Sequence, residues 1–356
     1  MALARITLTD FRNHRATRLD GAAQFNLLVG DNGAGKTNVL EALSLLAPGR
    51  GLRRAALVDI PANHGAGGFA VGAELTGGVQ IGTGARADKP ARRVVQVNGA
   101  EAPAVRLGEW LSIGWLTPAM DRLFAEGAGA RRRFLDRLVL ALEPGHARNA
   151  AKLEGALRER NRLLGEQQEP DPQWLDALEL QLAEAGAAVA QARVRLVARL
   201  ADALDALPEA PFARPVLQYQ SGGPLEAGEL AAELSLTRRR DRAAQRTLTG
   251  PHRDELGVMM AGKDQPAAEC STGEQKAMLI AITLAHAGLL SPDRPGLLLL
   301  DEVAAHLDPL RRAALFERLH QGSAQVWLTG TELPPFAAIA GEAAIWRVSD
   351  GLAERV

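Results

Sequence analysis

The feature that most constrains this chain is a glycine-rich segment, Gly30-Asp-Asn-Gly-Ala-Gly-Lys-Thr37, between an apolar run and a helical pattern. The apolar run covers residues 25–29, and after Gly35 apolar residues recur at helical spacing. The segment fits the pattern G-x-x-x-x-G-K-[ST], which requires a strand before it and a helix after it. This order predicts an α/β domain with a phosphate-binding loop (P-loop).

Each part of the P-loop has a predicted role in binding a nucleoside triphosphate, with ATP as the expected ligand. Its glycines let backbone N–H groups converge on the phosphates, and the helix N-terminus adds partial positive charge. The Lys36 ammonium reaches the β- and γ-phosphates, and the Thr37 hydroxyl ligates Mg²⁺. The predicted nucleotide-binding residues are Gly30, Asp31, Asn32, Gly33, Ala34, Gly35, Lys36 and Thr37.

A second motif, Leu297-Leu-Leu-Leu-Asp-Glu302, delivers two carboxylates at the end of a buried strand. Ligands of α/β sheets bind at the carboxyl ends of the strands. Asp301 is predicted to hold Mg²⁺ as the acid of a Walker B motif. Glu302 is placed to orient and deprotonate an attacking water, which makes it the predicted catalytic residue.

A third motif, Ser271-Thr-Gly-Glu-Gln275, stands before a helical pattern and has two interpretations. Ser271 and Glu274 are spaced as a capping box, in which each side chain bonds the other's backbone N–H. Alternatively, a hydroxyl and free N–H groups at a helix N-terminus suit a γ-phosphate. The residues concerned are Ser271, Thr272, Gly273, Glu274 and Gln275.

Between the P-loop and these motifs lies a segment of different character. Apolar residues from Leu175 to Leu196 alternate spacings of three and four, as in a heptad pattern. This pattern fits either a short coiled-coil arm or an antiparallel helical hairpin packed on itself. We expect an N-terminal half of the nucleotide-binding domain at 1–143, a helical insert at 144–246 and a C-terminal half at 247–356.

Composition excludes several classes of protein. The single cysteine, Cys270, rules out a disulfide framework within the chain, which fits a reducing cytosol. The N-terminus lacks the pattern of a signal peptide, and no stretch approaches the ~18 apolar residues of a membrane span. We therefore expect a cytoplasmic protein with no membrane partner. The net charge of −1 leaves nucleic-acid binding to charge clustering.

The order of these motifs resembles the ABC-type ATPase head, in which a P-loop is followed by a signature motif, Walker B and a D-loop. Four further segments resemble the RecF family of bacterial recombination mediators, over almost the full length. The expected fold is an α/β ABC-type head with a β-rich layer and an inserted α-helical second lobe. The four segments are Phe11-Arg-Asn13, Gly35 to Ala42, Arg132-Arg-Phe-Leu-Asp136 and Thr249-Gly-Pro-His-Arg-Asp254.

The resemblance implies a homodimer that forms on ATP. Ser271 of one copy then contacts the γ-phosphate bound at Lys36 of the other, and Asp308 of the D-loop lies along the dimer interface. Thr329 occupies the switch position, where ABC proteins usually have histidine, which predicts weaker γ-phosphate sensing. The family often has glutamate at the position of Ala119, and the Q-loop glutamine of other ABC heads is not identifiable. Both departures fit slow ATP turnover.

DNA as a partner follows mainly from this resemblance. Two arginine clusters are candidate phosphate contacts: Arg131, Arg132 and Arg133, and Arg238, Arg239 and Arg240. Aromatic residues do not interleave with them, so a grip on duplex or junction phosphates fits better than base stacking. A solvated helix face is the other interpretation of each cluster.

The resemblance implies an ATP-gated clamp on gapped or junction DNA that assists recombinase loading and the SOS response, together with other mediator proteins. A weak, DNA-stimulated ATPase is expected beside this role. The alternative is an SMC-like structural clamp or nucleotide sensor without significant hydrolysis.

Overall fold

The computed structural model describes residues 2–62, 65, 67–208, 210–291 and 293–356. Within them the chain forms two compact units. The first comprises 1–121, 209–212 and 279–356, and the second comprises 122–208 and 213–278. The second unit thus holds nearly all of the expected insert and also residues on both sides of it. None of the helices in the described part of the chain has the length and apolar character needed to cross a bilayer.

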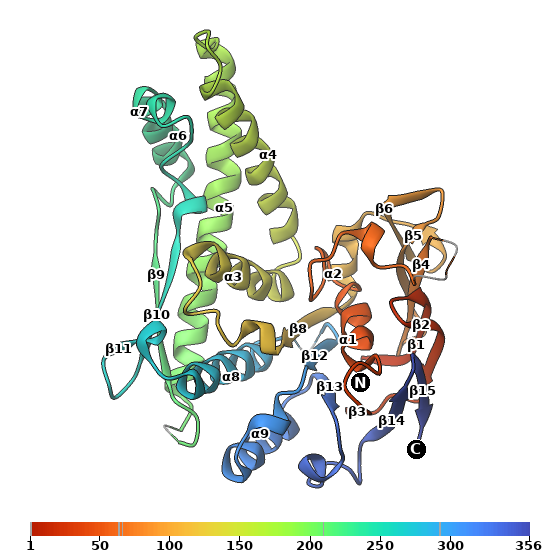
Figure 1. Ribbon diagram of the computed structural model, residues 1–356. Helices are drawn as coiled ribbons and strands as arrows, with labels where there is room; N and C mark the ends of the chain where they lie inside the picture. The colour runs from red at the N-terminus through yellow and green to blue at the C-terminus, as the bar shows by residue number, and fades with distance from the viewer. Residues whose placement is uncertain (1, 63–64, 66, 209, 292) are drawn as a thin grey trace. The chain divides into compact units, whose positions relative to one another are not determined.

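The first unit contains two six-stranded sheets, whose strands lie beside α1 in Figure 1. One sheet is antiparallel, and its order is β2 (His14–Asp20), β1 (Leu3–Phe11), β4 (Phe69–Leu75), β5 (Gln80–Arg86), β6 (Lys89–Val97) and β7 (Ala100–Glu101). The other is parallel except for its first strand, and its order is β15 (Leu352–Arg355), β14 (Ala344–Ser349), β3 (Phe25–Val29), β13 (Gln325–Gly330), β12 (Gly296–Leu300) and β8 (Ser112–Leu116).

Helix α1 (Lys36–Ser44) packs between the two sheets. Its apolar face, including Val39, Leu40 and Leu43, belongs to one buried cluster with residues of both sheets. Because burial stabilises by about 25 cal/mol per Å² of apolar surface, this cluster holds α1 against both sheets. The first unit also contains α2 (Leu107–Trp110) and α9 (Pro309–Gln321), and α8 (Thr272–Gly288) crosses the boundary between the units.

A buried amide joins the N-terminal strand to the parallel sheet. The Gln325 side chain is fully buried, and its oxygen accepts from the Leu3 N–H at 3.1 Å. Its nitrogen donates to the carbonyls of Leu3 and Ala23, each at 2.9 Å. Because every polar atom of this amide is paired, its burial carries no unsatisfied hydrogen bond. The pairing fixes β1 to β13, which lies next to the P-loop strand β3 in the sheet.

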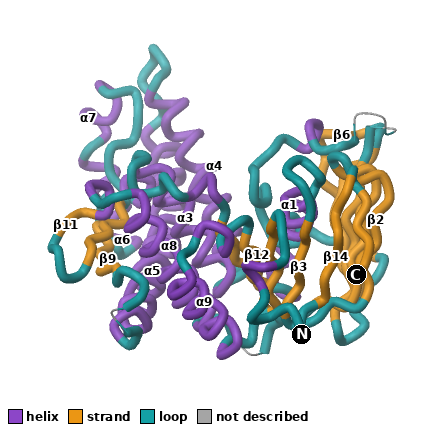
Figure 2. The backbone as a smooth tube through the Cα atoms, turned by 60° about the horizontal axis from the view of Figure 1, so that its bottom comes forward, coloured by secondary structure: helices purple, strands orange, loops and turns teal. Residues whose placement is uncertain are grey.

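The second unit is mainly helical, as the purple segments of Figure 2 show. Helices α4 (His146–Leu164) and α5 (Pro172–Asp205) run side by side in Figure 1 and are joined by a short connection, so they form an antiparallel hairpin. The remaining elements are α3 (Ala128–Leu142), α6 (Ala227–Leu236), α7 (Arg238–Ala243) and a small sheet ordered β11 (Gln265–Pro266), β10 (Glu255–Met260), β9 (Pro215–Gln220).

The packing of the heptad residues of α5 decides between the coiled-coil arm and the helical hairpin. Leu175, Leu178, Leu182 and Val189 are buried in a cluster with residues of α4 and α6. The pattern therefore belongs to a hairpin packed within its own unit, and the coiled-coil arm is wrong. Helix α3 and strand β8 lie outside the elements that the sequence pattern indicated.

Candidate nucleotide-binding site

The parallel register of three strands brings the predicted phosphate and metal residues to one edge of the sheet. Leu300 of β12 pairs with Leu328 of β13 and with Leu116 of β8, so Asp301 emerges beside Thr329. The Asp301 N–H donates to the Leu116 carbonyl at 2.9 Å, which extends the ladder by one residue. On the other side of β13, Gly330 pairs with Val29, the residue before the P-loop. The site is therefore built by strand pairing.

The P-loop geometry depends on two glycines. Gly35 has a φ of 118°, which disfavours any residue with a Cβ, and an added Cβ would lie 2.7 Å from Asn13 Oδ1 and 2.8 Å from His14 Nε2. At Gly30 an added Cβ would lie 2.0 Å from the Val348 carbonyl oxygen. The loop is thus pressed between the first hairpin and β14, where only glycine fits.

Lys36 and Thr37 point toward the loop and the neighbouring strand end. The Lys36 side chain is almost fully buried, and its ammonium donates to the carbonyls of Gly30 at 2.6 Å and Asp31 at 2.8 Å. The Thr37 hydroxyl donates to the Asp301 carboxylate at 2.9 Å, with the second oxygen at 3.2 Å. The ammonium is therefore held over the concave side of the loop, where phosphate oxygens would replace the carbonyls as acceptors.

Asp301 and Thr37 are suited to Mg²⁺. Both offer oxygen atoms, which Mg²⁺ prefers, and together with phosphate oxygens and water they provide an octahedral set. The described residues contain no cluster of three or more His, Cys, Asp or Glu side chains at metal-binding spacing, so no all-protein cage competes with this pair. Burial raises the pKa of Asp301 above its usual range, although the hydroxyls of Thr329 and Thr37 oppose the shift. A cation bound at this carboxylate would offset the free-energy cost of burying its negative charge.

Thr329 connects the two acidic residues. Its hydroxyl donates to Asp301 Oδ1 at 2.8 Å and accepts from the Glu302 N–H at 2.9 Å. Thr329 is buried, and Glu302 is half-buried with a φ of 53°. A non-glycine residue at positive φ is uncommon and needs support from its surroundings. The Thr329 hydroxyl supplies that support, so this side chain positions Asp301 and Glu302.

Residues of the hairpin of β1 and β2 hold the P-loop through its backbone carbonyls. This role was not predicted from the sequence. Asn13 Nδ2 donates to the Ala34 carbonyl at 2.9 Å, and His14 Nε2 lies 3.0 Å from the Gly35 carbonyl. His14 Nδ1 contacts the Thr17 hydroxyl at 2.9 Å. Burial lowers the pKa of His14 below its ordinary value of 6.5, so the ring is neutral at pH 7. The only sequence signal was that Asn13 belongs to a family segment.

Two arginines share the carboxylate of Glu41, which lies on α1 one turn beyond Thr37. Arg12 donates to both of its oxygens, at 2.9 and 2.6 Å, and Arg53 donates to one at 2.6 Å. Arg53 also donates to the Asn38 side chain at 2.6 Å. Glu41 is 2% exposed, so its charge requires such pairing. This network fixes the start of α1, and no local pattern in the sequence indicated it.

Ser271 to Gln275 form the capping box at the start of α8. Glu274 Oε2 accepts from the Ser271 N–H and hydroxyl, each at 3.0 Å, and the Glu274 N–H donates to Ser271 Oγ at 3.3 Å. Lys263 pairs with Glu274 from the β10–β11 turn, and this contact with the capping bonds lowers the pKa of Glu274 to about 2. Ser271, Thr272 and Gly273 are exposed, so the hydroxyl remains reachable from solvent. Asp308 likewise caps α9, accepting from the Arg311 N–H at 2.9 Å.

The two arginine clusters differ residue by residue in charge pairing. Arg131 donates to both oxygens of Glu255, at 2.7 and 2.8 Å, and Arg132 donates to the Asp254 carbonyl at 2.8 Å. Arg238 pairs with Asp176 and with Glu179. The members with exposed side chains are Arg133, Arg239 and Arg240.

The family segments in the second unit form a buried ion-pair network. Arg193 donates to both oxygens of Asp136, at 2.8 and 2.9 Å, and to Asp254 Oδ2 at 2.7 Å. Asp254 also accepts from the Gly222 N–H at 2.8 Å and from the Tyr219 hydroxyl. The network ties α3, α5 and the loop before β10 together. Arg193 is therefore a structural cation.

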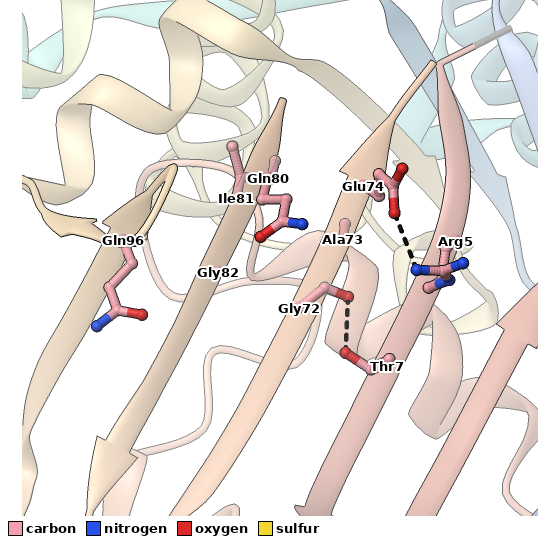
Figure 3. A pocket seen from close by; sticks show the side chains of 10 residues that line it. Arg5, Thr7, Gly72, Ala73, Glu74, Gln80, Ile81, Gly82 and Gln96 are labelled. Carbon is pink, nitrogen blue, oxygen red and sulfur yellow. Dashed lines mark hydrogen bonds and ion pairs between the residues drawn. The ribbon is translucent and has the colours of Figure 1, made fainter. Parts of the chain in front are cut away.

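A hollow on the antiparallel sheet lies outside the nucleotide site (Figure 3). It has a volume of about 320 Å³ and is floored by glycines, including Gly72 and Gly82. Arg5 at its edge pairs with Asp20 at 2.6 Å and with Glu74 at 3.0 Å. Because two carboxylates neutralise its one cation, the hollow offers no charge for a phosphate, and it contains none of the predicted site residues.

Comparison with known proteins agrees with this architecture. The sequence profile of the RecF/RecN/SMC N terminal domain family matches residues 2–336. The protein named DNA replication and repair protein RecF of Mesorhizobium japonicum is 48% identical over 98% of this chain and 96% of its own length. Its namesake from Rhizobium etli is 46% identical over 99% of this chain and 98% of its own.

Solved structures show the fold. The recombination mediator protein RecF-ATP in the RecFOR pathway superimposes with a TM-score of 0.87 at 22% identity, covering 100% of this chain and 97% of that one. The SMC head bound to the C-winged helix domain of ScpA gives 0.52 at 16% identity, covering 100% and 98%. These matches confirm the expected ABC-type head with its α/β and helical parts. The chain is a member of the RecF family.

Proposed function

We propose that this protein is an ATP-dependent DNA-binding protein of recombinational DNA repair. The observation that carries the proposal is the convergence of Lys36, Thr37, Asp301 and Thr329 at one sheet edge, from two strands and one helix. Full-length relatives named for DNA replication and repair, and a fold neighbour solved with ATP, support it. Since bacterial DNA lies in the cytoplasm, the protein would act there.

In the proposed site the P-loop N–H groups and Lys36 bind the phosphates. Thr37 and Asp301 would hold Mg²⁺, which neutralises phosphate charge during transfer. Glu302, beside Asp301, orients a water and accepts its proton, while Thr329 fixes the backbone from which Glu302 projects. Because Ala119 stands where the family often has glutamate, we expect turnover to be slow and nucleotide binding to be the main event.

A dimer completes the site. The exposed Ser271 hydroxyl and the N-terminus of α8 are suited to the γ-phosphate bound at Lys36 of a second copy. In that arrangement the Glu274 carboxylate must release the Ser271 hydroxyl, and its pairing with Lys263 reduces the repulsion of a phosphate. ATP then joins two copies, and hydrolysis separates them. Closure of the dimer around gapped or junction DNA would assist recombinase loading, the SOS response and contact with other mediator proteins.

The test is sedimentation of Ser271→Arg beside the wild type, with and without ATP and a gapped duplex. We expect the variant to bind ATP as a monomer with wild-type affinity and to lose ATP-dependent dimerisation and tight DNA binding. Lys36→Arg is the matched control, because it should weaken nucleotide binding itself. Dimerisation of Ser271→Arg with ATP would overturn the composite site.

An SMC-like clamp or sensor without significant hydrolysis remains the second candidate, favoured by Ala119 where relatives of this type often carry a carboxylate. Single-turnover measurements on the wild type and on Glu302→Gln decide between the two. If both hydrolyse ATP equally slowly, the sensor is correct.

A further inference from the structure

A cavity in the second unit belongs to no part of the proposed ATP site. It lies between the α4–α5 connection and the end of α6 with α7, and its volume is about 420 Å³. This size is within the range of sites that bind small molecules or a few side chains. Its ten lining residues are Leu164, Glu169, Pro170, Pro172, Leu175, Ser235, Leu236, Arg238, Arg239 and Arg242.

The lining is half apolar, and one apolar residue is unusually exposed. Five of the ten residues are leucine or proline. Leu236 ends α6 and is 82% exposed, while Leu164 and Leu175 form the buried floor. An exposed leucine beside a buried apolar floor offers a surface that an apolar side chain of a partner can cover.

The charges of the cavity leave positive charge available. Arg238 is occupied by Glu179 and Asp176. Arg239 is exposed and makes no hydrogen bond or ion pair with any residue that the structure describes. Arg242 donates through Nη2 to the carbonyls of the α4–α5 connection, at 2.9 to 3.2 Å. Its Nη1 is buried and finds no acceptor among the described residues.

Arg239 and Arg242 therefore have no carboxylate partner among the described residues, and a carboxylate is the best partner of a guanidinium. Glu169 is the one acidic side chain in the lining, and Arg239 and Arg242 outweigh it. A ligand that pairs with these arginines must therefore bring negative charge, and one that covers Leu236 must bring an apolar group.

We propose that this cavity binds an acidic segment of a partner protein, with a carboxylate at Arg239 and Arg242 and an aliphatic or aromatic side chain on Leu236. Nucleic acid fits less well, because a charged phosphate gains no favourable contact from the leucine and proline lining. None of the ten lining residues is an aromatic on which a base could stack. Arg239, which the sequence placed among the candidate DNA contacts, is thereby assigned to a protein interface.

The experiment selects binders of the full-length protein from a display library of random peptides. Peptides recovered with the wild type are then measured by fluorescence anisotropy against Leu236→Asp and Arg239→Glu. Both substitutions are at exposed positions, so the fold should persist. Leu180→Asp and Arg148→Glu are matched controls, since both residues are exposed, lie in the same unit and are outside the cavity lining.

We expect the selected peptides to combine Asp or Glu with Leu, Ile or Phe. Each cavity variant should bind them at least about tenfold more weakly, a loss of about 1.4 kcal/mol, and the controls should bind normally. Basic peptides, or equal losses in controls and cavity variants, would overturn the proposal. It would also fail if Leu236→Asp instead weakened binding of a duplex DNA probe or shifted self-association in sedimentation. Because the assay omits ATP, its failure is distinct from failure of the ATP-gated dimer.

Discussion

At the scale of single residues, the site is organised by side chains that do not touch a phosphate. Thr329 is the clearest example. It was predicted as the switch residue at the γ-phosphate, and its hydroxyl is bonded to Asp301 and to the Glu302 N–H. Whether it also senses the γ-phosphate stays a prediction, but its contacts assign it the positioning of both acids.

Replacing Thr329 with valine keeps the volume and removes both hydrogen bonds. The Glu302 N–H then lacks its acceptor and Asp301 loses a donor, which costs about 1 kcal/mol of unfolding free energy for each lost hydrogen bond. We expect ATP affinity to remain near the wild-type value and the hydrolysis rate to fall, because Glu302 loses its orientation. Thr329→Ser keeps the hydroxyl and should restore both the unfolding free energy and the hydrolysis rate. Equal rates for the valine and wild-type proteins would remove Thr329 from the mechanism.

His14 makes the stability of the P-loop region depend on pH. Its folded-state pKa lies below 6.5 because of burial, so on acidification the unfolded chain takes up the proton first. Stability therefore falls as pH drops through 6.5, by up to about 1.4 kcal/mol per pH unit. Urea titrations of the wild type and His14→Gln measure this. The difference between neutral and mildly acidic pH should be smaller in the variant. The remainder includes a contribution of the same sign from His252, whose pKa is also lowered, and one of opposite sign from His320, whose pKa is raised. Identical pH profiles would contradict the assignment.

At the scale of elements, the hairpin of α4 and α5 shows that the heptad pattern predicts an apolar helix face but not the helices that pack against it. The spacing predicted a helix with one apolar face, and that face is buried against α4 and α6. The choice between hairpin and arm depended on contacts far apart in the chain. The same holds for Arg160, which is fully buried between Glu179 at 3.0 Å and Asp241 at 2.8 Å.

The hairpin predicts a contrast between two leucines of α5. Leu182 is fully buried and Leu180 is 52% exposed. Leu182→Ala should lower the unfolding free energy of the second unit by about 2 to 5 kcal/mol, because it removes apolar contacts and leaves a cavity. Leu180→Ala should change it by less than about 0.5 kcal/mol. Thermal unfolding followed by circular dichroism gives both values, and similar losses would show that the face is assigned wrongly.

At the scale of the whole molecule, the net charge of −1 does not favour DNA, so binding must depend on local clusters. The structure restricts which arginines remain available, since Arg131 and Arg238 are paired with carboxylates. Arg133 and Arg240 keep exposed side chains and are the stronger candidates for phosphate contacts. Arg240 also pairs with Asp241, but at the longer distance of 3.7 Å.

The double variant Arg133→Ala, Arg240→Ala should therefore bind duplex DNA more weakly and with less salt dependence. Each lost phosphate contact reduces the slope of log K against log salt by about 0.9. Arg158→Ala is the control, because Arg158 is exposed and paired with Glu154 at 2.8 Å. An unchanged slope in the double variant would mean that these arginines do not touch DNA.

The sequence by itself determined the P-loop, the Walker B strand and the heptad helix. Each is a pattern within a few turns or one strand, where neighbouring residues dictate backbone geometry. The P-loop strand runs from Phe25 to Val29 as predicted. Gly35 has the positive φ that its loop requires.

The tertiary structure alone decided which side chains share a charge or a hydrogen bond across the chain. Strand register placed Thr329 against Asp301, and packing placed His14 under Gly35. Packing also buried Arg193 while leaving Arg239 free for a partner. An arginine in a sequence looks the same in all these settings. Its role depends on which distant carboxylate the fold brings to it, and only the folded chain sets that distance.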